Sequence, residues 1–285
     1  MLRKIIVIKR ILFDALGHYN DDDGWAMASH VALSSLMALF PFLIFAGTLA
    51  TFLGADAFSE TAVHLIFDTW PKAIADPIAR EVQNVLTVQR SGLLTISIIA
   101  AAYFAASGIE ALRVALNRAY REKETRSLLF RRTQSLAFVF VAAFGMAAIS
   151  FLLVLAPLVI QIAERWAPWI EPYLFTISFW RYAIAIFVLV FALVAVHLWL
   201  PDGDRPFVSI LPGIALTLAA WVASAVIFAT YLSLFANYFS TYAGLASIMV
   251  ALVFLYILAA IFIVGAELNA AINIYSDSRK RLLRR

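Results

Sequence analysis

The chain has no cysteine and few charged residues. Its 285 residues include 0 Cys, and only 14% are Asp, Glu, Lys or Arg. The missing thiols exclude a disulfide framework, a cysteine nucleophile and a thiolate zinc site. A soluble domain is about 45–50% apolar and about 25% charged, whereas this chain is 64% hydrophobic. It has too little polar surface to cover itself in water, and the composition therefore predicts a membrane protein.

The motifs of common enzymes and ATP-driven pumps are missing as well. The 4 histidines lie far apart and form no H-x-H, H-x-x-x-H or H-E-x-x-H pair, so a zinc hydrolase is poorly supported. No G-x-x-x-x-G-K-[ST] sequence occurs. We expect no enzymatic activity, no metal and no cofactor.

Six segments are long and apolar enough to span a bilayer as helices. A hydrocarbon core of about 30 Å takes about 20 apolar residues. No run of alternating ten-residue strands is present, so we expect an all-α bundle of six transmembrane helices. The segments are approximately Ala26–Leu53, Leu93–Ile109, Leu136–Ala163, Tyr182–Leu200, Val208–Ala236 and Leu245–Ile272.

The basic residues predict the orientation of this bundle. Of the 22 Lys and Arg, 17 fall in the two tails and in every second connection. Basic residues stay on the cytoplasmic side. Both termini are therefore expected in the cytoplasm and the chain in the bacterial inner membrane. The net charge of +4 reflects this asymmetry, and no nucleic-acid partner is expected; the oligomeric state is left open.

The predicted topology divides the chain into three parts. Residues 1–24 form a cytoplasmic segment, 25–273 the membrane domain with a periplasmic segment at 54–92, and 274–285 a basic cytoplasmic tail. Apolar residues at helical spacing over 3–19 predict an amphipathic helix on the inner leaflet. Asp21, Asp22 and Asp23 then end it. They either cap the first transmembrane helix or bind a divalent cation.

A single carboxylate, Glu267, falls inside a predicted span. Ionisable groups at membrane depth are costly and are often functional. We expect Glu267 to pair with Arg113 or Arg118 near the cytoplasmic end, either as a packing ion pair or as part of a site for substrate or protons. The other polar residues at this depth are Asn269, Asn273, Asn117, His30 and His197.

Two prolines interrupt predicted spans and are candidate helix kinks. Pro41 lies in the first span and Pro157 in the third. The cytoplasmic segments carry basic residues that either contact anionic lipid head groups or only set the topology. The candidates are Arg118, Arg121, Arg131 and Arg132.

Several stretches resemble the YihY/virulence factor BrkB family of bacterial inner-membrane proteins. They are Ala106–Glu122 with NRAY, Leu198–Gly213, Tyr231–Ile272 with GAELN, and Leu39-Phe40-Pro41. The resemblance extends from about Trp25 to Asn273. The sequence departs from the family where an aromatic pair is usual, at Leu33 and Ser34.

The resemblance implies six transmembrane helices with cytoplasmic termini. Its members were long labelled ribonuclease BN, an assignment regarded as mistaken, and the family has no agreed biochemical activity. The spacing of histidines and carboxylates likewise predicts no cluster that could hold nuclease metals. We expect a transporter or exporter of an amphipathic, lipid-like or small molecule in the phospholipid bilayer. The alternative is a non-transporting scaffold or envelope-integrity factor.

Overall fold

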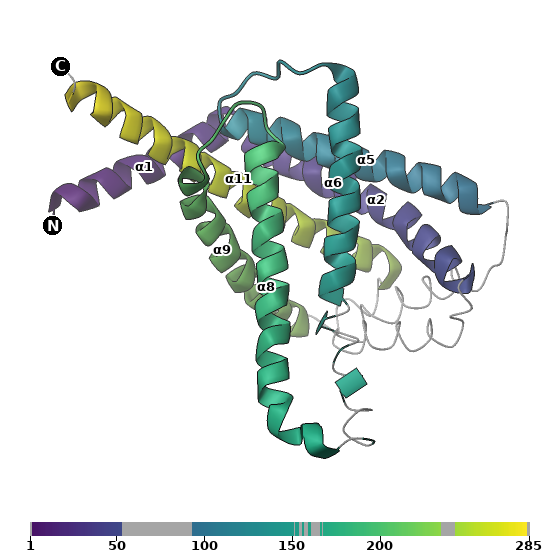
Figure 1. The fold of residues 1–285 in the computed structure, drawn as a ribbon. Helices are drawn as coiled ribbons and strands as arrows, with labels where there is room; N and C mark the ends of the chain where they lie inside the picture. Colours follow the sequence, from purple (N-terminus) through teal and green to yellow (C-terminus); the bar gives the residue numbers. More distant parts are fainter. Residues whose placement is uncertain are drawn as a thin grey trace.

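The described part of the chain is helical. The computed structural model describes residues 2–52, 93–150, 152–153, 156, 159–160, 166, 168–234 and 243–283. These residues form 7 α-helices and a short 3-10 helix and contain no strand, which confirms the all-α fold (Figure 1). The elements are α1 (Leu2–Asp21), α2 (Gly24–Phe52), α5 (Leu93–Ala119), α6 (Leu128–Ser150), η2 (Pro168–Tyr173), α8 (Leu174–Trp199), α9 (Phe207–Leu234) and α11 (Ala243–Leu283).

The helices coincide with the predicted segments but extend beyond several of them. The helix α6 begins at Leu128 and α8 at Leu174, each earlier than the apolar run that predicted it. The helix α11 continues to Leu283, beyond the predicted end at Ile272, because the sequence there contains no glycine or proline to stop it. The predicted helix over 3–19 is confirmed as α1.

Four helices are long and apolar enough to cross a membrane among the described residues. The candidate spans are Leu128–Gly145, Glu171–Trp199, Phe207–Leu232 and Ile248–Ser276. Large apolar side chains on α8 and α9 point away from the protein, as lipid-facing residues do. Phe187 is 68% and Ile227 69% exposed. Aromatic residues flank the Glu171–Trp199 span, with exposed Trp169 and Tyr173 before α8 and exposed Trp199 at its end. Such aromatic belts mark the two membrane interfaces.

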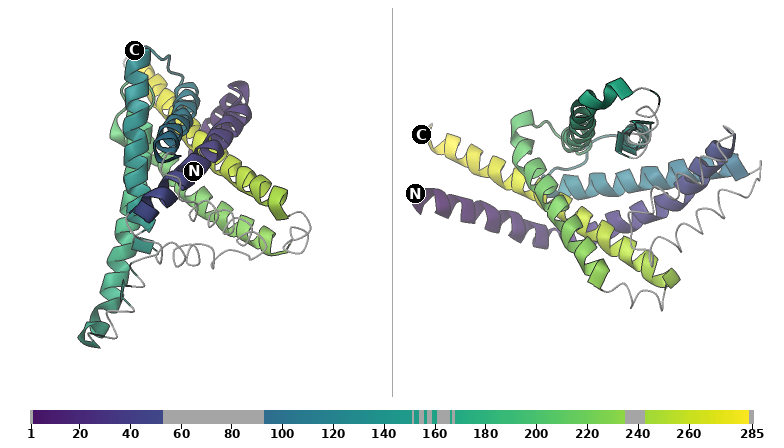
Figure 2. Two further views of the ribbon diagram at one scale, coloured as in Figure 1. Left: turned by 90° about the vertical axis from the view of Figure 1, so that its right-hand side faces the viewer. Right: turned by 90° about the horizontal axis from the view of Figure 1, so that it is seen from below.

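The helices converge near the connections from α5 to α6 and from α8 to α9 and diverge from there, while α1 and the C-terminal part of α11 project beyond this meeting end (Figure 1). In Figure 1 the connections from α5 to α6 and from α8 to α9 lie at the top, while the far ends of α2, α8 and α11 lie well apart. The view from below in Figure 2 shows the same fan. The buried core lies where the helices meet, with Leu116, Leu200, Ile210 and Ala266 fully covered. Buried polar residues of the same helices include Arg113, His197 and Asn269.

Alpha-helices α1 and α2 are joined by a sharp turn at the predicted position. Asp23 adopts a positive φ of 56°, and its carbonyl accepts the N–H of Met27 at 2.9 Å in the first turn of α2. A Cβ atom at Gly24 would collide with the ring of Tyr19, so glycine allows this close approach. The turn sets the end of α1 against α11.

Candidate functional site

Arg113 of α5 is a buried cation at the meeting end of the helices. Its side chain is 1% exposed and forms an ion pair with Glu110, one turn earlier on the same helix. Nη2 donates to Oγ of Ser135 on α6 at 3.2 Å, and Nε lies 3.8 Å from Oε2 of Glu124 in the following loop. We call these four residues the Arg113 cluster. Since each charge faces an opposite charge, the cluster ties α5, α6 and the loop together.

The loop after α5 is fastened to the turn between α8 and α9. Asn117 donates from Nδ2 to Oε2 of Glu124 at 2.9 Å and accepts the backbone N–H of Asp202 at 2.7 Å. Arg126 donates to both oxygens of Glu124, at 2.7 and 2.9 Å, and to the carbonyl of Leu200 at 3.0 Å. Burial raises the pKa of Glu124, but the hydrogen bonds from Arg126 and Asn117 outweigh it and the pKa falls below its ordinary value. Glu124 is therefore held as a carboxylate.

Asp202, in the turn between α8 and α9, binds Thr125 in the loop after α5. Its Oδ2 accepts both the backbone N–H and the hydroxyl of Thr125, each at 2.7 Å. These two bonds lower the pKa of Asp202 from 3.8 to about 2. Gly203 follows at φ 81°, where a Cβ atom would approach the Glu122 carboxylate. The composition Pro201–Pro206 predicts such a tight turn between antiparallel helices, and the structure confirms it.

A chain of hydrogen bonds links α5, α8 and α11. The hydroxyl of Tyr120 lies 2.7 Å from Nδ1 of His197, and Nδ2 of Asn269 donates to the same hydroxyl at 3.2 Å. Burial raises the pKa of Tyr120 to about 12, so the phenol keeps its proton at neutral pH. The guanidinium of Arg205 lies over the Tyr120 ring at 4.3 Å from its centroid.

Asn269 also binds the backbone of α9. Its Oδ1 accepts the N–H of Gly213 at 2.6 Å, and its Nδ2 donates to the carbonyl of Ile210 at 3.0 Å. Both backbone groups lie in the first two turns of α9, on either side of Pro212. A Cβ atom at Gly213 would overlap with the Gly265 carbonyl and the Asn269 amide. The two glycines allow α9 and α11 to pack at this distance.

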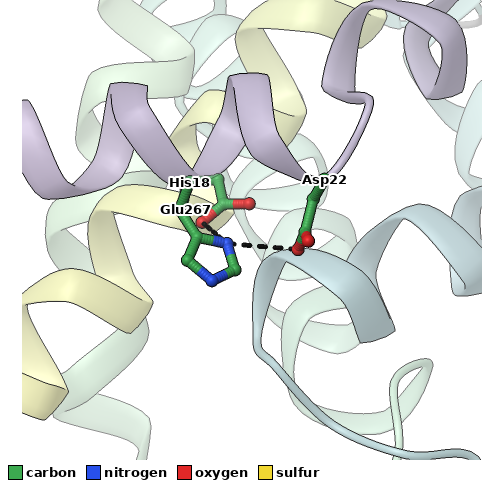
Figure 3. Close-up of side chains that lie close together, drawn as sticks. All are labelled: His18, Asp22 and Glu267. Atoms are coloured by element: carbon green, nitrogen blue, oxygen red, sulfur yellow. Dashed lines mark ion pairs between the residues drawn. The ribbon is translucent and has the colours of Figure 1, made fainter.

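Glu267 of α11 faces the last turn of α1. It is 1% exposed, and its Oε2 lies 3.7 Å from Nδ1 of His18. The same Nδ1 lies 3.1 Å from Oδ2 of Asp22. Figure 3 shows the imidazole between the two carboxylates. We call these three residues the His18 cluster. Their ligand atoms all lie within 4.8 Å of one another, close enough to bind one metal ion.

Comparison with known proteins assigns the chain to a family. A family model described as Virulence factor BrkB matches residues 15–285. The chain belongs to this family. Among curated BrkB-like relatives, the chain is 26% identical over 271 residues to "Putative ribonuclease-like protein YfkH" of Bacillus subtilis (strain 168), covering 95% of this chain and 96% of that protein. No solved structure matches the chain. The resemblance to the BrkB family is thus confirmed, and the chain is a membrane protein with long apolar helices.

The structure brings most of the predicted polar residues of this BrkB-family chain to one end, but in different pairs. The prediction that Glu267 pairs with Arg113 or Arg118 is wrong. Within the described ranges, Arg113 pairs with acidic groups of its own helix and loop, and Arg118 lies 4.0 Å from Asp23. The physical reason is that α1 packs against α11, which places His18 of the amphipathic helix beside Glu267.

Other predicted residues lie outside the two clusters. His30 is exposed on α2, and Asn273 is half-buried. Pro41 lies within α2, which continues as a helix on both sides of it, and Pro157 lies outside the described residues, as does the segment 54–92. Three of the four proposed head-group contacts pair with carboxylates of the chain itself, and Arg132 is exposed. Besides Arg118 with Asp23, the ion pairs are Arg121 with Asp14 at 3.0 Å and Arg131 with Glu110 at 4.0 Å.

Sequence reasoning missed several participants and one cluster. It predicted no grouping of histidine and carboxylates, yet the fold brings His18 and Asp22 to Glu267. The i, i+4 spacing of His18 and Asp22 on α1 is a signal that points to a shared helix face. Tyr120 had no such signal, because its partners come from α8 and α11, at sequence separations of 77 and 149.

Proposed function

We propose that this BrkB-family chain is an inner-membrane transporter for an amphipathic, lipid-like molecule, with six spans and both termini in the cytoplasm. One observation carries the proposal. Glu267 is a buried carboxylate inside Ile248–Ser276, the most apolar candidate span, and its Oε2 has no hydrogen-bond donor among the described residues. Burying such a carboxylate at membrane depth costs free energy, and carboxylates in this position are typical of ion or substrate pathways.

The arrangement of the helices supports the same proposal. The ends that carry the Arg113 cluster and the His18 cluster meet, while the opposite ends fan out (Figures 1 and 2). The basic loops lie at the meeting end, and by the retention of basic residues this end faces the cytoplasm.

A non-transporting scaffold is the second candidate, and the Arg113 cluster favours it. Both of its carboxylates lie near the guanidinium of Arg113, as expected for a rigid junction rather than a moving gate. The two candidates differ in what Glu267 does. In a transporter its substitution removes flux, whereas in a scaffold it changes only stability.

Proteoliposomes separate the two candidates. Purified protein is reconstituted into liposomes with a fluorescent phospholipid, and quenching from outside follows the movement of this lipid between leaflets. A pH-sensitive dye in the lumen reports proton flux at the same time. We expect lipid movement above that of empty liposomes, and its loss in Glu267→Gln without a matching loss of thermal stability. Asp14→Asn, an exposed carboxylate on α1, is the matched control and should keep full flux. Folded wild-type protein that moves no lipid would overturn the transporter and favour the scaffold.

We also propose that the chain is not an enzyme, although the name of its Bacillus subtilis relative says ribonuclease-like. The support is that the charged side chains of the Arg113 cluster and of the loop after α5 are paired with one another across helix junctions. Pure protein should leave RNA intact. Cleavage that is abolished when Asp21, Asp22 and Asp23 are replaced would revive the nuclease.

A further inference from the structure

The His18 cluster has the composition of a metal site. It offers one imidazole nitrogen from α1, one carboxylate oxygen from Asp22 directly after α1, and one from Glu267 of α11, 245 residues further along the chain than Asp22. Imidazole together with carboxylates suits Zn²⁺ and similar divalent transition ions better than Ca²⁺ or Mg²⁺, which prefer six or more oxygens. The cluster therefore favours one chemical class of ion.

The distances agree with shared coordination of one ion. Ligands about 2.0–2.2 Å from a tetrahedral zinc lie about 3.3 Å from one another. Nδ1 of His18 lies 3.1 Å from Oδ2 of Asp22 and 3.7 Å from Oε2 of Glu267. All three ligand atoms fall within 4.8 Å. The two distances from Nδ1 differ from the zinc value by a few tenths of an ångström, and rotation of the two carboxylate side chains would bring their oxygens to an ion between them.

A second, independent observation points to a ligand. Glu267 is 1% exposed, yet its Oε2 has no hydrogen-bond partner within the described chain, and neither has Nδ1 of His18. In Figure 3 both atoms are directed into the space between the three side chains. Buried polar atoms are normally hydrogen-bonded. A cation bound between these two atoms would satisfy both of them.

We propose that the His18 cluster binds one divalent transition-metal ion of the Zn²⁺ class through Nδ1 of His18, Oδ2 of Asp22 and Oε2 of Glu267. Water completes the coordination from the exposed side, since His18 and Asp22 are only partly buried. The ion ties the end of α1 to α11 and neutralises the carboxylate inside the bundle. This site goes beyond the proposed transport, and its test needs no transport measurement.

The competing arrangement is a protonated His18 that bridges the two carboxylates. It uses the same distances but leaves no place for a metal, because a protonated imidazole has no free lone pair. Other charges nearby are already engaged. Arg118 donates to the carbonyl of Asp22 at 3.2 Å, and Arg121 pairs with Asp14 at 3.0 Å. Only direct metal binding decides between the two.

The experiment uses the full chain in detergent, freed of metal with a chelator and then titrated with Co²⁺ and Zn²⁺. We expect one Co²⁺ per chain with visible absorption bands that Zn²⁺ removes and that Mg²⁺ and Ca²⁺ do not. Zn²⁺ should also raise the Tm, because it binds only the folded arrangement.

Matched variants assign the ligands. Loss of a residue that merely supports a metal ligand costs about 10- to 100-fold in affinity, so loss of a ligand should cost at least about tenfold. We expect this from Glu267→Gln, Asp22→Asn and His18→Gln. The controls are Asp14→Asn on the same helix and His30→Gln on α2, both outside the cluster. If Glu267→Gln does not fold, the two partly exposed positions on α1 still carry the test. Absence of Zn²⁺ binding by folded wild type, or equal affinity in cluster and control variants, would overturn the site.

Discussion

Oδ1 of Asn269 accepts the backbone N–H of Gly213 at 2.6 Å, joining α11 to α9 inside the protein. The N–H belongs to the first turns of α9, where Pro206 precedes the helix and Pro212 lies within it. Nδ2 of the same amide donates to the carbonyl of Ile210 at 3.0 Å. One side chain of α11 thus binds the backbone of α9 on both sides of Pro212.

Replacing Asn269 should therefore destabilise the protein. Asn269→Ala removes the hydrogen bonds to the Gly213 N–H and the Ile210 carbonyl in a fully buried place. The expected cost is about 1–3 kcal/mol in the free energy of unfolding. Denaturation in mixed micelles measures it. Asn273→Ala, one turn later on the same helix and half-buried, is the control and should cost less. Equal losses in the two variants would show that the amide is not the cause.

The close approach of α9 and α11 predicts a second effect. In Gly213→Ala the new Cβ atom would overlap with the Gly265 carbonyl and the Asn269 amide. Pushing two packed helices apart costs about 1–3 kcal/mol. Gly145→Ala is the matched control, because its Cβ atom would meet only Cγ1 of Val188 at an ordinary 3.8 Å. Alanine favours a helix over glycine, so this control should keep or raise the Tm. A Tm unchanged in Gly213→Ala would contradict the packing described.

The two substitutions should also be coupled. Asn269→Ala and Gly213→Ala disturb one contact, so the loss in the double variant should be smaller than the two single losses together. Simple additivity in the double-mutant cycle would indicate that the two residues act on separate contacts.

Arg113 offers a prediction about buried charge. Arg113→Met removes one cation from Glu110 and from Glu124, which keep only Arg131 and Arg126, respectively. Removing one partner of a buried pair costs about 3–5 kcal/mol, and we expect the lower part of this range because each carboxylate keeps a second arginine. Arg118→Met, whose side chain is 45% exposed, should cost no more than about 0.5 kcal/mol. Adding Glu110→Gln to Arg113→Met should recover part of the Tm. No recovery would mean that packing of the long side chain, and not its charge, holds the junction.

The sequence predicted the helices well and their polar partners poorly, for a physical reason. Apolar runs and turn residues act locally, so the ends of α1 and α9 were found close to their positions in the structure. The partner of Glu267 depends on how helices cross in space. Counting helix ends placed Arg113 at the right depth, but the crossing of α1 over α11 brings His18 to the carboxylate. A single sequence carries no signal for that crossing.

Asp202 gives the stability of the loop junction a pH dependence. Its pKa is about 2 in the folded protein, lowered from 3.8 chiefly by the hydrogen bonds from Thr125. A lowered pKa stabilises the fold above the unfolded value, and this contribution is lost as the pH falls from about 4 to about 2. The Tm of wild type should exceed that of Asp202→Asn at pH 6, and the difference should shrink as the pH falls through this window. A difference that stays constant from pH 6 to pH 2 would contradict a role of the charge.

The absence of cysteine makes the orientation directly testable, since each introduced thiol is then the single one in the chain. Ser127 and Asp204 are exposed in the two connections at the meeting end of the helices, and Glu171 is exposed before α8 at the opposite end. If the meeting end is cytoplasmic, a membrane-impermeant maleimide should label Glu171→Cys in intact spheroplasts. It should label Ser127→Cys and Asp204→Cys only after the membrane is opened. The reverse pattern would invert the topology, and it would place the His18 cluster on the outer side of the membrane.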